Sequence, residues 1–154
     1  MPRRCEKGES NKVTLLLHRL REKEEEISQA LTALAEESAQ GIPIIVEGKK
    51  DVETLRELGV EGKIICAKTG GKSLLDVVFD IEQDKPAEVI LLLDFDRRGK
   101  QITTRIRHNL EKARIKVRLD YWLQLLSSAG KDAQCIEGLN AYLVNLRAKT
   151  ETLR

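Results

Sequence analysis

Three carboxylates in this sequence stand where a divalent cation could be held. Glu47 follows the apolar run Pro43–Val46, and Asp94 and Asp96 follow the apolar run Val89–Leu93. Side chains on a strand alternate with a period of two, so Asp94 and Asp96 share a side if the extended conformation continues that far. Carboxylates confined together repel one another unless a cation neutralises them, and oxygen ligands suit Mg²⁺ or Mn²⁺. The sequence therefore predicts a metal site formed by these three residues.

Basic residues accompany these acids. Two lysines, Lys49 and Lys50, follow Glu47 after one glycine, and the segment Arg97–Arg118 holds nine Lys or Arg against one acid. The free N–H groups and the dipole at the start of a helix favour a bound anion such as phosphate. A metal ion held beside that phosphate can polarise it and activate water. The residues that we expect to contact phosphate are Lys49, Lys50, Lys72, Arg97, Arg98, Lys100, Arg105 and Arg107.

The basic residues of the predicted helix 100–114 recur every seven positions and form two stripes. One stripe holds Lys100, Arg107 and Arg114, and the other holds Arg98, Arg105 and Lys112. Each stripe flanks an apolar one formed by Ile102, Ile106, Leu110 and Ala113. Two basic stripes suit an extended polynucleotide strand better than a single nucleotide, whereas a simple solvated face is the alternative.

Each acid also has an explanation that involves no chemistry. Glu47 could be an exposed loop residue, and Asp94 or Asp96 could cap a helix. All three nevertheless fall at the same edge of the predicted sheet, which favours a shared function. The loop Lys68–Ser73 does not form a P-loop, because Cys66 stands where the first glycine is required. We expect this loop to be flexible and to touch phosphate.

The elements that must position these residues alternate between strand and helix. The patterns predict strands at 42–48, 62–68, 87–94 and 115–122, and helices at 49–59, 73–84 and 100–114. Apolar and basic residues alternate in the last strand, which is typical of a sheet edge. The order predicts an α/β fold with a four-stranded, mainly parallel sheet flanked by helices. Ligands gather at the carboxyl ends of such strands, and Glu47 approaches the aspartates if the first and third strands are neighbours.

Helical segments flank this alternating region. Apolar residues recur every seven positions in residues 11–38, from Val13 to Leu34, with Ser10 as a plausible N-cap. Glu24 interrupts the seam, so this helix docks on the domain or pairs with a second copy. The predicted organisation is an N-terminal helical extension at 1–40, the α/β domain at 41–125, and a tail of one or two short helices at 126–154.

Composition limits the class of protein further. The chain has 154 residues, of which 41% are hydrophobic, as expected of a globular protein. Only 3% are aromatic, which argues against recognition of single strands by stacking of aromatic side chains on bases. Apolar runs stay well short of the ~18 residues that a membrane span needs, so we expect a cytoplasmic protein with no membrane partner. Cys5, Cys66 and Cys135 form no C-x-x-C pair, which argues for reduced thiols and against a zinc or disulfide framework.

Two stretches together resemble the Toprim domain of topoisomerases, bacterial-type primases, M5-type ribonucleases and OLD-family nucleases. They are IIVEGKKDVETLRELG and VILLLDFDRRGK, and the likeness spans residues 42–120. The sequence most resembles the small stand-alone Toprim proteins of archaea and some bacteria, which implies a Rossmann-like fold. It also implies Glu47 as a metal ligand that transfers a proton, and Asp94 and Asp96 as ligands of one or two Mg²⁺ ions, with Mn²⁺ as a substitute. Asp51 would support them.

The resemblance implies nucleic-acid processing and leaves two functions open. The first is Mg²⁺-dependent phosphodiester hydrolysis in RNA or DNA. The second is a non-catalytic module that binds metal and nucleic acid, or associates with a ribonucleoprotein. A phosphatase of the Asp-x-Asp type is less favoured, because its acid pair follows the first strand. The expected partners are nucleic acid, a second copy bound through the N-terminal helix, and a ribonucleoprotein component; no cofactor besides the metal is expected.

Overall fold

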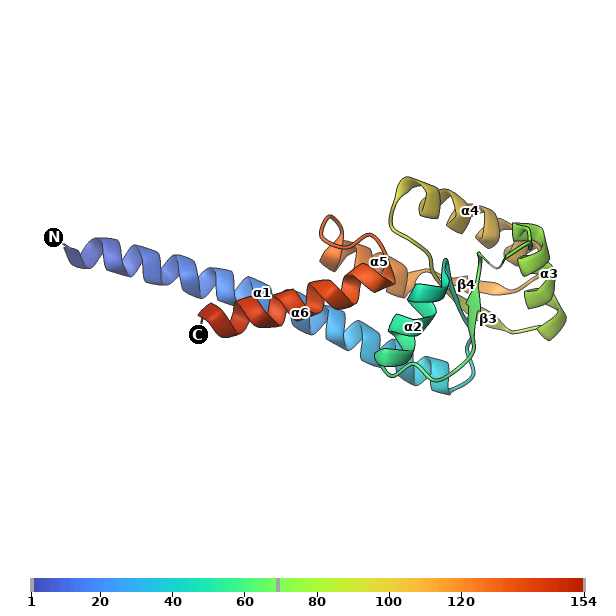
Figure 1. Cartoon of the computed structure of the whole chain (residues 1–154), viewed down its shortest axis with the longest axis horizontal. Coiled ribbons are helices and arrows are strands. Elements are labelled where there is room, and N and C mark those ends of the chain that lie inside the picture. The colour runs from blue at the N-terminus through green and yellow to red at the C-terminus, as the bar shows by residue number, and fades with distance from the viewer. Residues whose placement is uncertain (1, 69, 154) are drawn as a thin grey trace.

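The structure is a computed structural model that describes residues 2–68 and 70–153, with side chains from residue 11 onward. Helices and strands follow one another along this described chain as shown in Figure 1. The helices are α1 (Pro2–Ala39), α2 (Lys49–Glu57), α3 (Leu74–Asp84), α4 (Arg97–Lys112), α5 (Asp120–Ala129) and α6 (Ile136–Leu153). The strands are β1 (Ile44–Val46), β2 (Ile64–Cys66), β3 (Glu88–Leu92) and β4 (Lys116–Arg118).

The four strands form one sheet in the order β2-β1-β3-β4, and all of the pairs are parallel. Val46 at the end of β1 lies opposite Leu92 at the end of β3. The chain moves outward from β1 to β2 in one direction and from β3 to β4 in the other. The order therefore reverses between β1 and β3, and such a switch point opens a crevice at the carboxyl ends of the strands.

Alternating residues of the central strands β1 and β3 point to opposite faces of the sheet and belong to two separate hydrophobic cores. Ile45, Leu91 and Leu93 pack with α3 and α4 on one face. Ile44, Val46 and their neighbours pack on the other face against apolar residues of α1, α2, α5 and α6. The central strands are thus buried on both sides, which explains their continuous apolar sequence and holds the ends of β1 and β3 in fixed positions.

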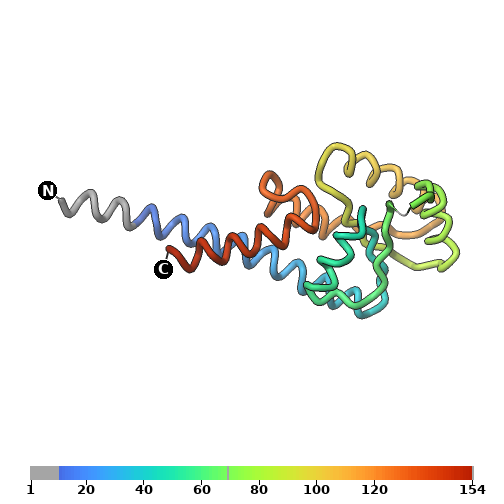
Figure 2. The backbone as a smooth tube through the Cα atoms, viewed as in Figure 1, coloured from blue at the N-terminus to red at the C-terminus, as the bar shows by residue number. Residues whose placement is uncertain are grey.

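Helix α1 is much longer than its packed part. Its C-terminal half buries Ile27, Leu31 and Leu34 in the core, and α6 lies beside it (Figure 2). Arg147 Nε of α6 lies 2.9 Å from Glu24 Oε1 of α1. The N-terminal half differs, since the side chains of Val13 and Leu16 are 42% and 49% exposed. The apolar stripe of α1 therefore packs against the domain along its C-terminal half, and part of it is exposed to solvent in the N-terminal half.

The structure confirms the predicted fold class, the edge position of β4 and the pairing of the first and third strands. The predicted strand 115–122 was too long, because β4 ends at Arg118 and Asp120 begins α5. The reason is a change of period: Tyr121, Trp122 and Leu125 recur at helical spacing and are buried together.

The predictions for the two ends of the chain also need correction. Helix α1 begins at Pro2 rather than after Ser10, because residues 3–9 are mostly good helix formers. The tail forms α5 and an 18-residue α6, which is not short. Residue 125 lies within α5, and the division into extension, domain and tail stays a prediction.

Candidate functional site

Glu47 and Asp94 meet at the switch point of the sheet. Glu47 follows β1, is only 3% exposed, and its Oε2 accepts a hydrogen bond of 3.3 Å from the backbone N–H of Asp94. Gly99 in the first turn of α4 packs directly against the backbone of Asp94. A side chain would not fit there, since a Cβ at this position would lie 2.0 Å from the Asp94 carbonyl oxygen. The two acids that the sequence predicts at neighbouring strand ends are therefore brought into direct contact.

The contact between these acids changes how each binds a proton. Burial, followed by the neighbouring carboxyl of Glu47, raises the pKa of Asp94 to about 7. Burial alone would also raise the pKa of Glu47, but hydrogen bonds from Lys68 and Asp94 outweigh it and lower that pKa. Lys68 Nζ lies 2.9 Å from Glu47 Oε1. The pair thus holds a proton on Asp94 near neutral pH, where a cation could replace it.

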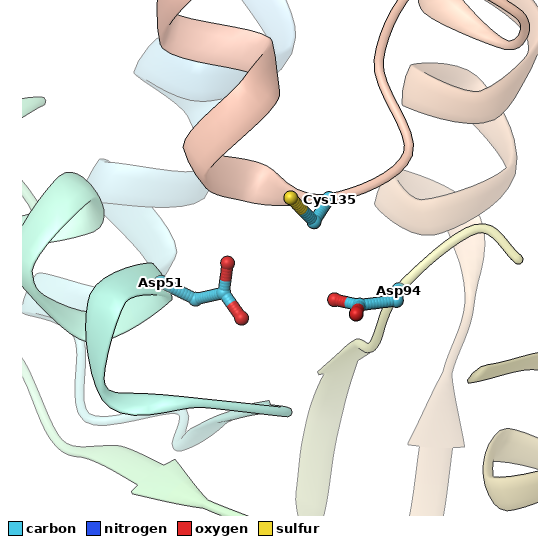
Figure 3. Close-up of side chains that lie close together, drawn as sticks. All are labelled: Asp51, Asp94 and Cys135. Carbon is cyan, nitrogen blue, oxygen red and sulfur yellow. The ribbon is translucent and has the colours of Figure 1, made fainter. Parts of the chain in front are cut away.

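Asp51 and Cys135 complete a small cluster around Asp94. Asp51 comes from α2, Asp94 from the loop after β3, and Cys135 from the segment that precedes α6. Figure 3 shows the three side chains facing a common space. Asp51, Asp94 and Cys135 each offer one ligand atom, and these atoms lie within 4.8 Å of one another. Asp51 is 6% exposed, and burial raises its pKa.

Asp51 also has a structural task. Its Oδ2 accepts a hydrogen bond from Gly48 N at 3.1 Å, which caps α2, and its Oδ1 accepts one from Glu137 N at 3.3 Å, in the first turn of α6. The supporting role that the sequence predicts for Asp51 agrees with these bonds. The carboxylate joins two helix starts to the acidic centre, and both helix dipoles favour its negative charge.

Asp96 is placed differently from the other two predicted ligands. Its side chain is exposed, and Oδ1 accepts a hydrogen bond of 2.7 Å from Gly99 N as the N-cap of α4. Strand β3 ends at Leu92, so the alternation that would align Asp96 with Asp94 stops before them. The capping alternative describes Asp96 in this structure, and its role as a metal ligand stays a prediction.

The predicted phosphate-binding cations fall into three groups. Lys72, Arg98 and Arg105 line a groove of about 640 Å³ that runs from Glu47 between the loop after β2 and α4. Lys49 and Lys50 line a smaller pocket of about 250 Å³ over Asp51 and Asp94. The rest, Arg97, Lys100 and Arg107, line neither of these two cavities.

Sequence reasoning missed two members of the site. Lys68 lines both cavities and pairs with Glu47, but nothing in the KTGGKS loop distinguishes it from Lys72. Cys135 lies far from the paired motifs in sequence, and no C-x-x-C spacing marks it as a ligand. The fold of the tail, rather than the spacing of the motifs, brings Cys135 to the acids.

Comparison with known proteins agrees with this geometry. The family model described as the Toprim domain matches residues 42–122, which include Glu47, Asp94 and Asp96. A solved structure of a protein from Aquifex aeolicus superposes with a TM-score of 0.60 at 28% identity, over 71% of this chain and 94% of that one. The match, the parallel sheet and the paired acids define the class of protein as a Toprim domain.

Similar proteins narrow this class. The UPF0292 protein of Methanocaldococcus jannaschii is 39% identical over 119 residues, covering 77% of this chain and 88% of that protein. The UPF0292 protein of Methanosarcina barkeri is 34% identical over 130 residues, covering 84% and 89%. The chain therefore belongs to the Toprim family and, within it, to the small UPF0292 proteins of archaea.

Membership has consequences for the site. A Toprim domain is a metal-binding module of nucleic-acid-processing proteins, and it takes divalent ions. The donors here fit such an ion, since the buried carboxyls of Glu47 and Asp51 and the half-buried carboxyl of Asp94 supply oxygen ligands whose mutual repulsion a cation relieves. Among the described residues, no helix is long and apolar enough to cross a membrane.

Proposed function

We propose that this protein hydrolyses phosphodiester bonds in RNA or DNA with Mg²⁺, for which Mn²⁺ can substitute. One observation carries the proposal: Glu47, which is buried and hydrogen-bonded to the backbone of Asp94, lines a groove together with Lys68, Lys72, Arg98 and Arg105. The pair supplies the oxygen ligands, and the groove supplies the positive charge that a polynucleotide backbone requires. A metal ion bound there would polarise the scissile phosphate and lower the pKa of water.

The residues of the chain have separable tasks in this proposal. Asp94 would hold the metal as a carboxylate, and Glu47 would accept or return a proton through Oε1 once Lys68 has moved to the substrate. Lys68 is half exposed and flexible enough to change partner, from the carboxylate to a phosphate oxygen. Arg98 and Arg105 hold the neighbouring phosphates and stabilise the charge that develops.

A second function is supported by the ion pair itself. Lys68 already neutralises Glu47, and the Asp96 carboxylate is occupied with capping α4. A site arranged in this way could bind metal and orient phosphate without turnover, as a nucleic-acid-binding or ribonucleoprotein-associated module. This alternative needs the same residues for binding but predicts no cleavage.

A cleavage assay separates the two functions. The protein is incubated with structured RNA, single-stranded DNA or duplex DNA in Mg²⁺, in Mn²⁺ or in a chelator. Glu47→Gln and Asp94→Asn should lower cleavage by roughly a hundredfold or more, because each removes a group that acts on the reacting phosphate. The matched control Glu57→Gln, an exposed residue at the end of α2, should cleave like the wild type. Metal-dependent binding by the wild type and Glu57→Gln that is weakened in Glu47→Gln and Asp94→Asn, without cleavage by any of the four proteins, would refute hydrolysis and support the binding module.

A further inference from the structure

Cys135 adds a sulfur ligand to a centre that otherwise offers only oxygen. The segment from Gln134 to Glu137 is fastened to the acidic centre on both sides of the cysteine. Phe95 N donates to the Gln134 carbonyl oxygen at 2.6 Å, and Glu137 N donates to Asp51 Oδ1 at 3.3 Å. Between them, Ile136 is 2% exposed and anchors the start of α6 in the core. The backbone is therefore fixed so that the thiol faces Asp51 and Asp94 (Figure 3).

The three side chains retain capacity for a metal ion. Each Asp51 oxygen accepts one backbone hydrogen bond, and a carboxylate oxygen has a second lone pair. The ligand atoms of Asp51, Asp94 and Cys135 lie within 4.8 Å of one another. Ligands that surround one ion at about 2.0–2.3 Å lie within roughly 4 Å of each other, so small side-chain rotations bring these atoms into range.

We propose that Asp51, Asp94 and Cys135 form a carboxylate–thiolate site for a first-row transition-metal ion of the Zn²⁺ or Co²⁺ type. Thiolate sulfur favours these ions over Mg²⁺, and three protein ligands leave a fourth position for water or phosphate. The thiol releases its proton to the solvent when the metal–sulfur bond forms. This inference rests on the proposed function only in using the same metal-binding centre.

The proposed site differs from the zinc and disulfide frameworks that the cysteine spacing argues against. The absence of a C-x-x-C pair excludes the usual structural zinc motifs, in which cysteines supply two or more ligands. A single cysteine combined with two aspartates from other elements leaves no such spacing in the sequence. Cys66 does not replace Cys135, since its Sγ donates to the backbone carbonyl oxygen of Glu47 at 3.8 Å.

Co²⁺ titration of the full chain tests the proposal without relying on cleavage. The wild type should develop the near-ultraviolet charge-transfer absorption of a sulfur–cobalt bond, and Zn²⁺ should abolish it by displacement. Cys135→Ser should lose this absorption and bind Zn²⁺ at least about tenfold more weakly, with Mg²⁺ affinity changed by less than about threefold. Cys66→Ser is the matched control and should retain the absorption.

A second measurement uses the wild-type protein and does not depend on how a variant folds. Zn²⁺ should slow alkylation of Cys135 by iodoacetamide much more than alkylation of Cys66, as followed by peptide mass spectrometry. Co²⁺ binding without a sulfur band, or equal protection of both thiols, would overturn the thiolate ligand and leave the proposed hydrolysis intact. Failure of Mg²⁺, Mn²⁺, Co²⁺ and Zn²⁺ alike to bind would overturn both.

Discussion

At the scale of single residues, Asp94 combines two opposing demands. In the proposed metal site it lies against Glu47 to share the ion, yet burial and that neighbour raise its pKa to about 7. An unfolded Asp ionises near pH 3.9. Between about pH 4 and pH 7 the unfolded chain therefore loses this proton while the folded protein keeps it, so the free energy of unfolding falls as the pH rises.

Replacing Asp94 by Asn should remove this part of the pH dependence. In the presence of a chelator, we expect Asp94→Asn to be more stable than the wild type at pH 8. The gain should be on the order of 2 kcal/mol, after allowance for the partial solvent screening of a half-buried group. Urea unfolding at pH 5 and pH 8 measures the effect, and the difference between the two proteins should be much smaller at pH 5.

Comparison with a control isolates the contribution of Asp94. The raised pKa of Asp51 acts in the same direction, whereas the lowered pKa of Glu47 stabilises the fold above about pH 4.5, a benefit lost as the pH falls through its folded value. The Asp51 carboxyl and the contact between Lys68 and Glu47 are present in the wild type and in the variant. Asp132→Asn, at an exposed position, should follow the wild type. Parallel profiles for Asp94→Asn and the wild type would contradict the raised pKa.

At the scale of elements, α4 presents its two basic stripes to different surroundings. Arg98 and Arg105 of one stripe line the groove beside Glu47. Arg107 of the other stripe lies outside it and pairs with Glu111, with 3.0 Å between Nε and Oε1. The sequence predicts phosphate contact for both stripes, and the structure favours the first as the track for a polynucleotide.

A salt series of binding measurements distinguishes the stripes. Arg105→Gln should reduce the slope of log affinity against log salt by about 0.7–0.9, the loss of one phosphate contact. Arg107→Gln removes the same charge from the same helix and should change the slope far less. Fluorescence anisotropy with a labelled single-stranded RNA gives both values. Equal slopes for these variants and the wild type would show that the groove side of α4 is only a solvated face.

Much of this arrangement could be predicted from local pattern, and some of it could not. The apolar runs before Glu47 and Asp94 fixed the sheet edge on which both acids lie, and their meeting required only that strands one and three be neighbours. The orientation of Asp96 depended on where β3 ends, which period-two alternation does not specify. Cys135 depended on tertiary packing of α6, because its segment is fastened by backbone hydrogen bonds that carry no sequence signature.

At the scale of the whole molecule, residues 13–16 of α1 expose apolar side chains, namely Val13, Leu15 and Leu16. Leu16 and Leu20 line an apolar groove of about 440 Å³ with Ala148 and Leu153 of α6. The charges of α1 are also segregated. Residues 12–21 contain three Lys or Arg and no acid, whereas residues 22–26 contain four Glu and one Lys. An antiparallel pair of α1 helices would place each basic segment beside the acidic segment of the other copy.

We therefore expect a second copy of the chain to cover this face in a homodimer. Leu16→Glu should weaken the dimer about a hundredfold or more, since two buried leucines are lost and each contributes about 1.5–3 kcal/mol. Sedimentation equilibrium measures the change, with Leu75→Glu, a 65% exposed residue of α3, as the control. Salt tests the orientation: it should weaken an antiparallel dimer, whose opposite charges meet, and strengthen a parallel one. A wild-type chain that stays monomeric at every concentration would refute the interface.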